Sequence, residues 1–208
     1  MILIISESML LKNSRHRKCI KNTWCIFEKL SKTIWIVVNY EKLNWMNEQY
    51  LRAMPDSKLL SKAQVILKEA GREVDDHLLS RALIVEKGRM THVNDILGVI
   101  GIYVDPFNYD PELLVWKKAD ATDAKQQLMD VRALLDTLPE ASFETVEEID
   151  KHLMDHMEKN DLQKGNVLWP LRVALSGAKA SPSPFELLWV FGKIESLRRI
   201  DEALNKLS

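Results

Sequence analysis

Apolar residues recur at helical spacing along the chain from residue 39 onward, and no stretch alternates as a half-buried strand would. The clearest stripe steps by 4, 3, 4 and 3 residues and stops at Pro139. It consists of Ala124, Leu128, Val131, Leu135 and Leu138. Further apolar faces are Leu43, Met46, Tyr50 and Met54; Leu78, Leu79, Ala82 and Leu83; Val146, Ile149, Leu153 and Met157; and Leu187, Val190 or Phe191, Ile194, Leu197, Ile200 or the neighbours of Asp201, Leu204 and Leu207. The pattern predicts an all-α fold.

Capping signals and a break divide this helical region. Thr145 with Glu148, and Ser183 with Glu186, have capping-box spacing. The stretch 104–111 contains two prolines and is the best boundary, with Asp110 and Pro111 restarting a helix. A further helix is expected from Thr91. We therefore expect two small helical subdomains, residues 39–105 and 106–208, after an atypical basic segment at 1–38.

The stretch 165–185 holds the most distinctive local pattern. Pro170 at a first turn and Gly177 after a last turn predict a short apolar helix. A small-residue loop follows, and then Pro184 opens a long amphipathic helix. Arg172 therefore stands beside a proline-stiffened loop that faces a helix N-terminus, which suits an anionic, base-bearing ligand.

Two sequence blocks carry a family resemblance. The first, YEKLNWMNEQYLR, covers residues 40–52; the second has PLRVALSG, a small-residue loop, Ser-Pro, and then FELL and GK. Together they resemble the C-terminal anticodon-binding region of bacterial-type glutamyl-tRNA synthetases, and the resemblance covers about residues 39–208. It implies the α-helix cage fold of class I synthetases, with tRNA(Glu) as partner.

The resemblance also implies which residues bind tRNA. The family's arginine and its Ser/Thr-Pro loop, which contact anticodon bases, correspond to Arg172, Ser181, Pro182 and Pro184. Two parallel donors on a guanidinium suit base acceptors, and loop amides and proline faces can hold an unstacked base. Lys179 is expected to attract phosphate without reading sequence.

A second base-reading arginine of the family corresponds to Gly88 here, which is a departure from the family pattern. Lys87 and Arg89 flank it, so Arg89 either substitutes from one position away or the base is read less tightly. Both cations could instead simply favour the dipole at a helix C-terminus. Arg172 likewise has an alternative, as a surface arginine paired with a carboxylate.

The sequence shows no catalytic constellation. ATP and Mg²⁺ belong to the full-length family, and no residue here is assigned to bind them, so the chain alone is predicted not to charge tRNA. Lys29–Thr33 is similar to the family's KMSKS-like loop, but only 6 residues separate Thr33 from Tyr40, whereas the family's loop lies far upstream, so we reject that interpretation. His152 and His156 share a helix face without a third metal ligand. Among the tryptophans, which are expected in the core, Trp169 stands out because it precedes Pro170.

Charge and cysteine usage complete the picture. Residues 39–160 carry 15 Lys and Arg against 23 Asp and Glu, so a nucleic-acid site must be local. Cys19 and Cys25 fit reduced thiols in the cytoplasm. No apolar run is long enough for a membrane span. We expect an altered start over residues 1–26, a monomer, and possibly a separate catalytic chain; the alternative is a helical protein-interaction module without RNA binding.

Overall fold

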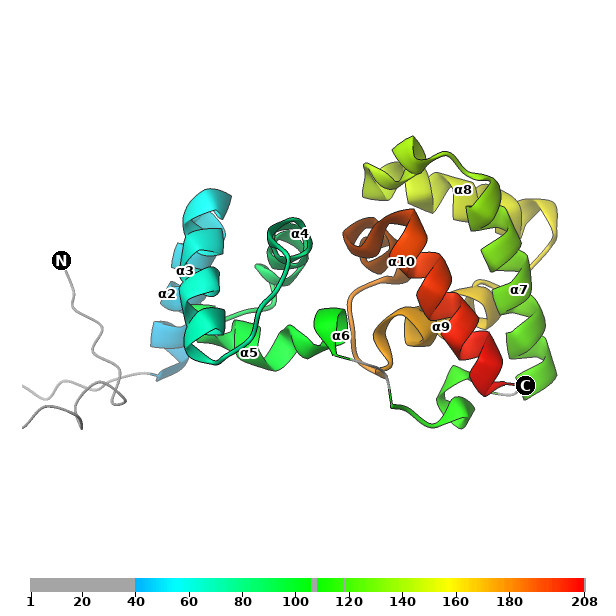
Figure 1. The fold of residues 1–208 in the computed structure, drawn as a ribbon, viewed down its shortest axis with the longest axis horizontal. Coiled ribbons are helices and arrows are strands. Elements are labelled where there is room, and N and C mark those ends of the chain that lie inside the picture. The colour runs from blue at the N-terminus through cyan, green and yellow to red at the C-terminus, as the bar shows by residue number, and fades with distance from the viewer. Residues whose placement is uncertain (1–39, 106–107, 118, 208) are drawn as a thin grey trace, which may run out of the picture. The chain divides into compact units, whose positions relative to one another are not determined.

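Helices are the only regular elements in the computed structural model, which describes residues 40–105, 108–117 and 119–207 (Figure 1). The all-α prediction is confirmed. Residues 44–208 form one compact unit. The predictions for the basic segment 1–38 and its two cysteines fall outside the described residues, and the subdomain boundary near 104–111 stays a prediction.

Local signals in the sequence mark where the first three described helices begin or end. These helices are α2 (Tyr40–Ala53), α3 (Asp56–Glu69) and α4 (Asp76–Glu86). Pro55 separates α2 from α3, Gly71 follows α3 with a φ of 71°, and Asp75 caps α4 through the amides of His77 and Leu78. The buried faces of α3 and α4 comprise Leu59, Ala63, Leu67, Leu79, Ala82 and Leu83.

The predicted inward face of α2 is wrong in part. Tyr50 is 67% exposed and Trp45, expected in the core, is 58% exposed, whereas Leu51 is buried. Leu43 is exposed as well. Helical spacing alone does not say which of two apolar stripes turns inward, because the packing partner decides that.

The helix expected from Thr91 is fragmented. In its place lie η2 (Val93–Asp95), α5 (Ile96–Val99) and α6 (Gly101–Val104). Two glycines within this stretch, Gly98 and Gly101, disfavour one continuous helix. Asp110 does cap the element that follows, through the amide of Glu112, but this element is only the 3-10 turn η3 (Pro111–Leu114).

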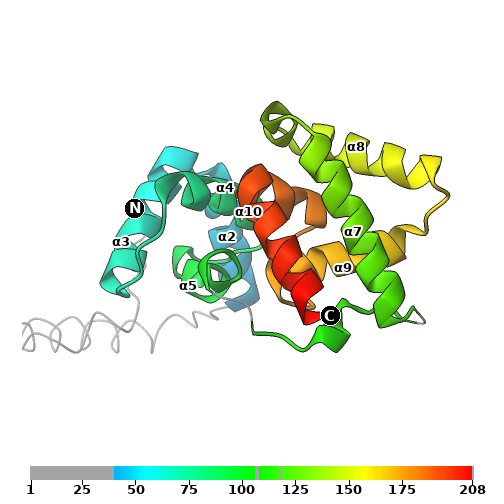
Figure 2. The ribbon, with the colours of Figure 1, turned by 45° about the vertical axis from the view of Figure 1, so that its right-hand side comes forward.

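The C-terminal elements pack around α10. They are α7 (Ala121–Thr137), the 3-10 turn η4 (Glu140–Phe143), α8 (Val146–Lys159), α9 (Lys164–Ser176) and α10 (Pro184–Lys206). Helix α9 lies against both α7 and α10 (Figures 1 and 2). The stripe of α7 and the Ile149, Leu153 and Met157 face of α8 are buried as predicted. Thr145 caps α8 through the amide of Glu148.

Pro170 lies inside α9, not at its first turn, which corrects the predicted short helix. The helix begins six residues earlier, at Lys164, and ends at Ser176, with Gly177 (φ 66°) as its C-cap. Proline has no amide hydrogen, so one helical hydrogen bond is lost at this point. Burial of Val167, Pro170 and Leu171 offsets that loss.

Helix α10 is bent at Gly192, where φ is 68° and ψ is −176°. The bend changes which side of the helix faces inward. Leu187, Val190 and Phe191 before the bend and Ile200 after it are buried as predicted. Ile194 is instead 76% exposed, and Ser196, Arg199 and Ala203, which were not predicted to face inward, are buried. The predicted apolar stripe of α10 is therefore wrong at Ile194, just after the bend.

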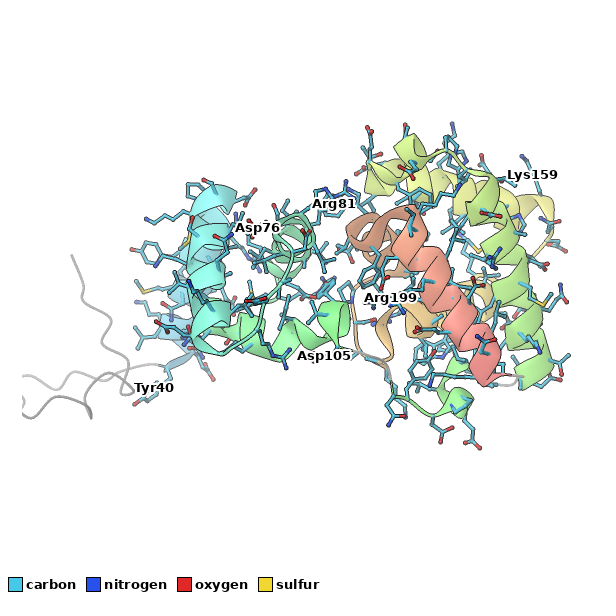
Figure 3. The ribbon with its side chains drawn as sticks, in the orientation of Figure 1. Tyr40, Asp76, Arg81, Asp105, Lys159 and Arg199 are labelled. Atoms are coloured by element: carbon cyan, nitrogen blue, oxygen red, sulfur yellow. The ribbon has the colours of Figure 1, made fainter. Side chains whose placement is uncertain are left out.

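The bend lies next to a contact with α4. Arg81 extends from α4 toward α10, and its Nη1 donates to the carbonyl of Trp189 at 2.5 Å (Figure 3). The same guanidinium lies 5.0 Å from the centre of the Trp189 ring. A cation against an aromatic face and a carbonyl together fix the N-terminal half of α10 against α4.

Candidate nucleic-acid interface

Arg172 is fastened to the loop that follows α9. Its Nε donates to the hydroxyl of Ser181 at 2.9 Å, and its Nη2 donates to the carbonyl of Ser181 at 2.5 Å. Both bonds lie along one edge of the guanidinium, so the plane and direction of the group are fixed. Within the described part of the chain, Nη1 has no hydrogen-bond partner. The end of the guanidinium that carries Nη1 is thus the part available to a ligand.

The beginning of the loop is held by a buried serine. The Ser176 hydroxyl donates to the carbonyl of Arg172 at 2.7 Å and accepts from the amide of Ala178 at 3.2 Å. Ser176 is only 3% exposed. The left-handed Gly177 lies between these contacts and turns the chain back toward Arg172. The loop is therefore fixed at its start by the predicted Gly177 turn and by the Ser176 side chain, which sequence reasoning had not identified.

The end of the loop is held by the predicted capping box. The amide of Glu186 donates to the Ser183 hydroxyl at 3.2 Å, and the amide of Ser183 donates to Oε2 of Glu186 at 2.8 Å. Pro184 occupies the first turn of α10 as expected. Pro182 and Pro184 are both buried, so their rings serve to anchor the loop.

A tryptophan pair stands one helical turn before Arg172. Trp169 and Trp116 have ring centres 4.7 Å apart at an interplanar angle of 39°. The indole nitrogen of Trp169 donates to the carbonyl of Leu113 at 2.9 Å, which fixes its orientation. Residues three apart on a helix share a side, so Trp169 and Arg172 lie on the same side of α9.

Beside this pair is an open cavity of about 460 Å³. Trp169 and the exposed Lys179 line it together with Leu113, Val115 and two carboxylates, Asp110 and Glu112. The carboxylates disfavour a phosphate inside the cavity, whereas the half-buried indole of Trp169 suits a planar, uncharged ring. Lys179 remains exposed at the rim, where a phosphate can approach it.

The two cations flanking Gly88 are both engaged inside the molecule. Lys87 Nζ lies 2.7 Å from Oδ1 of Asp56 and 2.6 Å from the carbonyl of Met54. Arg89 Nη2 lies 3.1 Å from Oε2 of Glu186. The exposed Arg52, which sequence reasoning missed, donates to the Gly88 carbonyl at 3.5 Å. These contacts join α2, α4 and α10 and leave neither Lys87 nor Arg89 as a freely presented cation.

No metal-binding or membrane-spanning element stands out in the described ranges. Among them, no three His, Cys, Asp or Glu side chains are grouped to hold a metal ion. His152 lies 3.5 Å from the Ser142 hydroxyl. None of the helices of residues 40–207 that the structure describes is both long and apolar enough to cross a bilayer.

Comparison with known proteins decides the family. The profile of the family described as "Anticodon binding domain" matches residues 43–204, which run from α2 almost to the end of α10. This chain belongs to the anticodon binding domain family. The sequence resemblance drawn from residues 40–52 and from the PLRVALSG block is confirmed, since both blocks lie mainly within the matched range.

Relatives of this anticodon binding domain are glutamate–tRNA ligases. One from Clostridium botulinum (strain Loch Maree / Type A3) is 33% identical over 175 residues, covering 82% of this chain and 35% of the relative. One from Dehalococcoides mccartyi is 31% identical over 187 residues, covering 87% and 38%. This chain thus spans roughly a third of the length of the curated relatives that it matches.

Solved structures agree with the sequence relatives. The crystal structure of a glutamate tRNA ligase from Elizabethkingia meningosepticum in complex with its amino acid aligns with a TM-score of 0.66 at 25% identity. The alignment covers 82% of this anticodon binding domain chain and 33% of the solved chain. A second structure, from Elizabethkingia anophelis, aligns with a TM-score of 0.58 at 25% identity.

Proposed function

We propose that this chain binds the anticodon of tRNA(Glu) and serves as the anticodon-binding part of a glutamate–tRNA ligase. The observation that carries the proposal is the Arg172–Ser181 clamp. It presents one end of a guanidinium beside a loop that is fixed at both of its ends. A preoriented guanidinium can donate to base edges at little entropic cost, which is what sequence-selective contact with an unstacked base requires.

The base-binding surface that we propose consists of Arg172, Ser181 and the face of Trp169. Lys179 supplies charge at its edge, and Pro182 and Pro184 act by holding the loop. Glutamate activation with ATP and Mg²⁺ would require the remaining two-thirds of a ligase, supplied by a separate catalytic chain or by a longer form of the protein. We expect the domain to act as a monomer in the cytoplasm.

Titration with an anticodon stem-loop tests this function. The RNA is the tRNA(Glu) stem-loop, its comparison is the same stem-loop with a changed anticodon, and both are measured at two salt concentrations. Binding should weaken with salt, because Lys and Arg displace counterions from phosphates, and should favour the glutamate anticodon. Equal affinity for both RNAs, or no binding at low salt, would contradict the proposal.

A second function is favoured by the surface of α2. Trp45 and Tyr50 line an open, largely apolar depression with Met46, Gln49 and Ala53. Exposed aromatic residues at one place are typical of a protein-binding surface. The protein-interaction function would be favoured by two results together. The chain would bind neither stem-loop, and Trp45→Ser would lose self-association or partner binding.

A further inference from the structure

A series of polar contacts connects the core to the loop that follows α9. It begins at Tyr103, which is 2% exposed and donates its hydroxyl to Oε1 of Glu86 at 2.7 Å. Glu86 is itself only 3% exposed. Burial, and then the nearby carboxylate of Glu86, raise the pKa of Tyr103 far above its ordinary value, so this hydroxyl stays a donor. The Tyr103–Glu86 hydrogen bond therefore keeps its donor and acceptor over the physiological pH range.

Arg89 forms the next contact. Its Nη1 donates to the carbonyl of Val85 at 3.0 Å and lies 4.0 Å from Oε2 of Glu86. Its Nη2 reaches Oε2 of Glu186, at 3.1 Å, in the first turn of α10. Arg89 thus links the end of α4 to a residue 97 positions later in the chain.

Glu186 connects Arg89 to the end of the loop. The oxygen that accepts from Arg89 is also the one that accepts the Ser183 amide, at 2.8 Å. Partial burial alone would raise the pKa of Glu186, but the hydrogen bonds from Ser183 and Arg89 together hold it below its ordinary value. Glu186 is therefore ionised and makes both contacts at neutral pH.

Electrostatics argue against Arg89 as a contact for RNA phosphate. Its guanidinium lies between two carboxylates, Glu86 and Glu186, so its charge is already compensated. A phosphate approaching it would also approach both acids. Arg172, in contrast, has a serine as its partner and faces no carboxylate in the contacts that fix it.

We infer that Arg89 is a positioning residue for the anticodon-binding loop, acting through Glu186 and the Ser183 amide and not by touching RNA. The inference rests on the proposed function, because the loop that it positions is the proposed base-binding loop. In this arrangement, α4 and α9 hold the same loop from two directions. Arg89 fixes its end through the capping box, and Arg172 fixes Ser181 two residues before Ser183.

The decisive experiment compares Arg89→Ala, Glu186→Gln and the double variant in the full chain. Binding to the two stem-loops at two salt concentrations is measured alongside hydrogen exchange of the Ser183 and Glu186 amides without RNA. Each single variant should speed amide exchange and narrow the preference for the glutamate anticodon by roughly three- to thirtyfold. The double variant should resemble the single variants, and the salt slope should not change. Arg72→Ala is the matched control, since it removes an arginine–carboxylate pair, with Asp105, that makes no contact with the loop.

Several results would overturn the inference. If Arg89→Ala weakened both RNAs equally and lowered the salt slope by about one, while Glu186→Gln did nothing, Arg89 would be a phosphate contact. Unchanged amide exchange in both variants would show that the contacts do not position the loop. A wild-type chain that binds neither RNA would count against the proposed function alone, since the exchange result still decides whether Arg89 positions the loop.

Discussion

The guanidinium of Arg199 donates from Nη2 to the backbone carbonyl of Tyr103 at 2.7 Å, across 96 residues of sequence. Its Nη1 reaches the carbonyls of Ile102 and Leu175, at 3.0 and 2.7 Å, and its Nε pairs with Glu195. The guanidinium of Arg199 also lies 3.7 Å from the centre of the Phe191 ring (Figure 3). One buried side chain thus fastens the ends of α6 and α9 to α10.

Replacing Arg199 with Ala should therefore strongly destabilise the protein. The change leaves the carbonyls of Ile102, Leu175 and Tyr103 without this donor and removes one of the two arginines that pair with Glu195, and Arg199 is only 3% exposed. Each buried carbonyl that loses its donor costs about 1–3 kcal/mol. The loss is measured as the free energy of unfolding in urea. The neighbouring Arg198, which pairs with Glu195 and Glu202 at 53% side-chain exposure, is the control and should change stability by less than about 1 kcal/mol. Equal losses for both variants would contradict the role given to Arg199.

Gly192→Ala should destabilise the protein although its new methyl group meets no atom within 4 Å. The φ of 68° with a ψ near 180° is open almost only to glycine, so a side chain should cost about 1–3 kcal/mol. Urea unfolding measures this cost. Gly98→Ala is the matched control, because Gly98 has equally open space within a helix and should gain up to about 1 kcal/mol. A stabilising Gly192→Ala would show that α10 can straighten.

Arg172→Ala should reduce preference for the glutamate anticodon by about 1–3 kcal/mol, as loss of a base-reading arginine does. Ser181→Ala removes only the hydroxyl acceptor and keeps the carbonyl, so it should have a smaller effect in the same direction. Lys179→Ala should weaken both stem-loops alike and lower the salt slope by about one. If Arg172→Ala weakened both RNAs equally, Arg172 would contact phosphate and not a base.

The capping box should lose strength in acid. The pKa of Glu186 is lower in the folded protein than in the unfolded chain, because the bonds from Ser183 and Arg89 outweigh the effect of burial. Its stabilising contribution is therefore complete above the unfolded pKa, about 4.3, and is lost as the pH falls through the folded value. The stability difference between wild type and Glu186→Gln should be largest at pH 7 and should vanish in acid. A constant difference across this range would contradict the assignment.

The sequence by itself determined the helical class, the family and the local caps. Period and capping chemistry act over a few residues, so the α7 and α8 stripes, the Ser183–Glu186 box and the Gly177 turn could be predicted from neighbours alone. Arg172 was singled out from the pattern around it, and Ser181 through the family resemblance. The direction of the Arg172 guanidinium could not be predicted, because the loop must first fold back before Ser181 can accept from it.

Only the tertiary structure decided the contacts between distant segments. Helix α9 continues through Pro170 because burial of the neighbouring apolar residues compensates for one missing hydrogen bond. Tertiary packing also decided that Trp45 and Tyr50 lie on the exposed side of α2. The bend at Gly192 then moved Ile194 to the surface and brought Arg199 inside. Arg89 shows the limit most clearly: its partner Glu186 lies 97 residues away. No local period encodes such a pair, because it exists only once α4 and α10 have packed together.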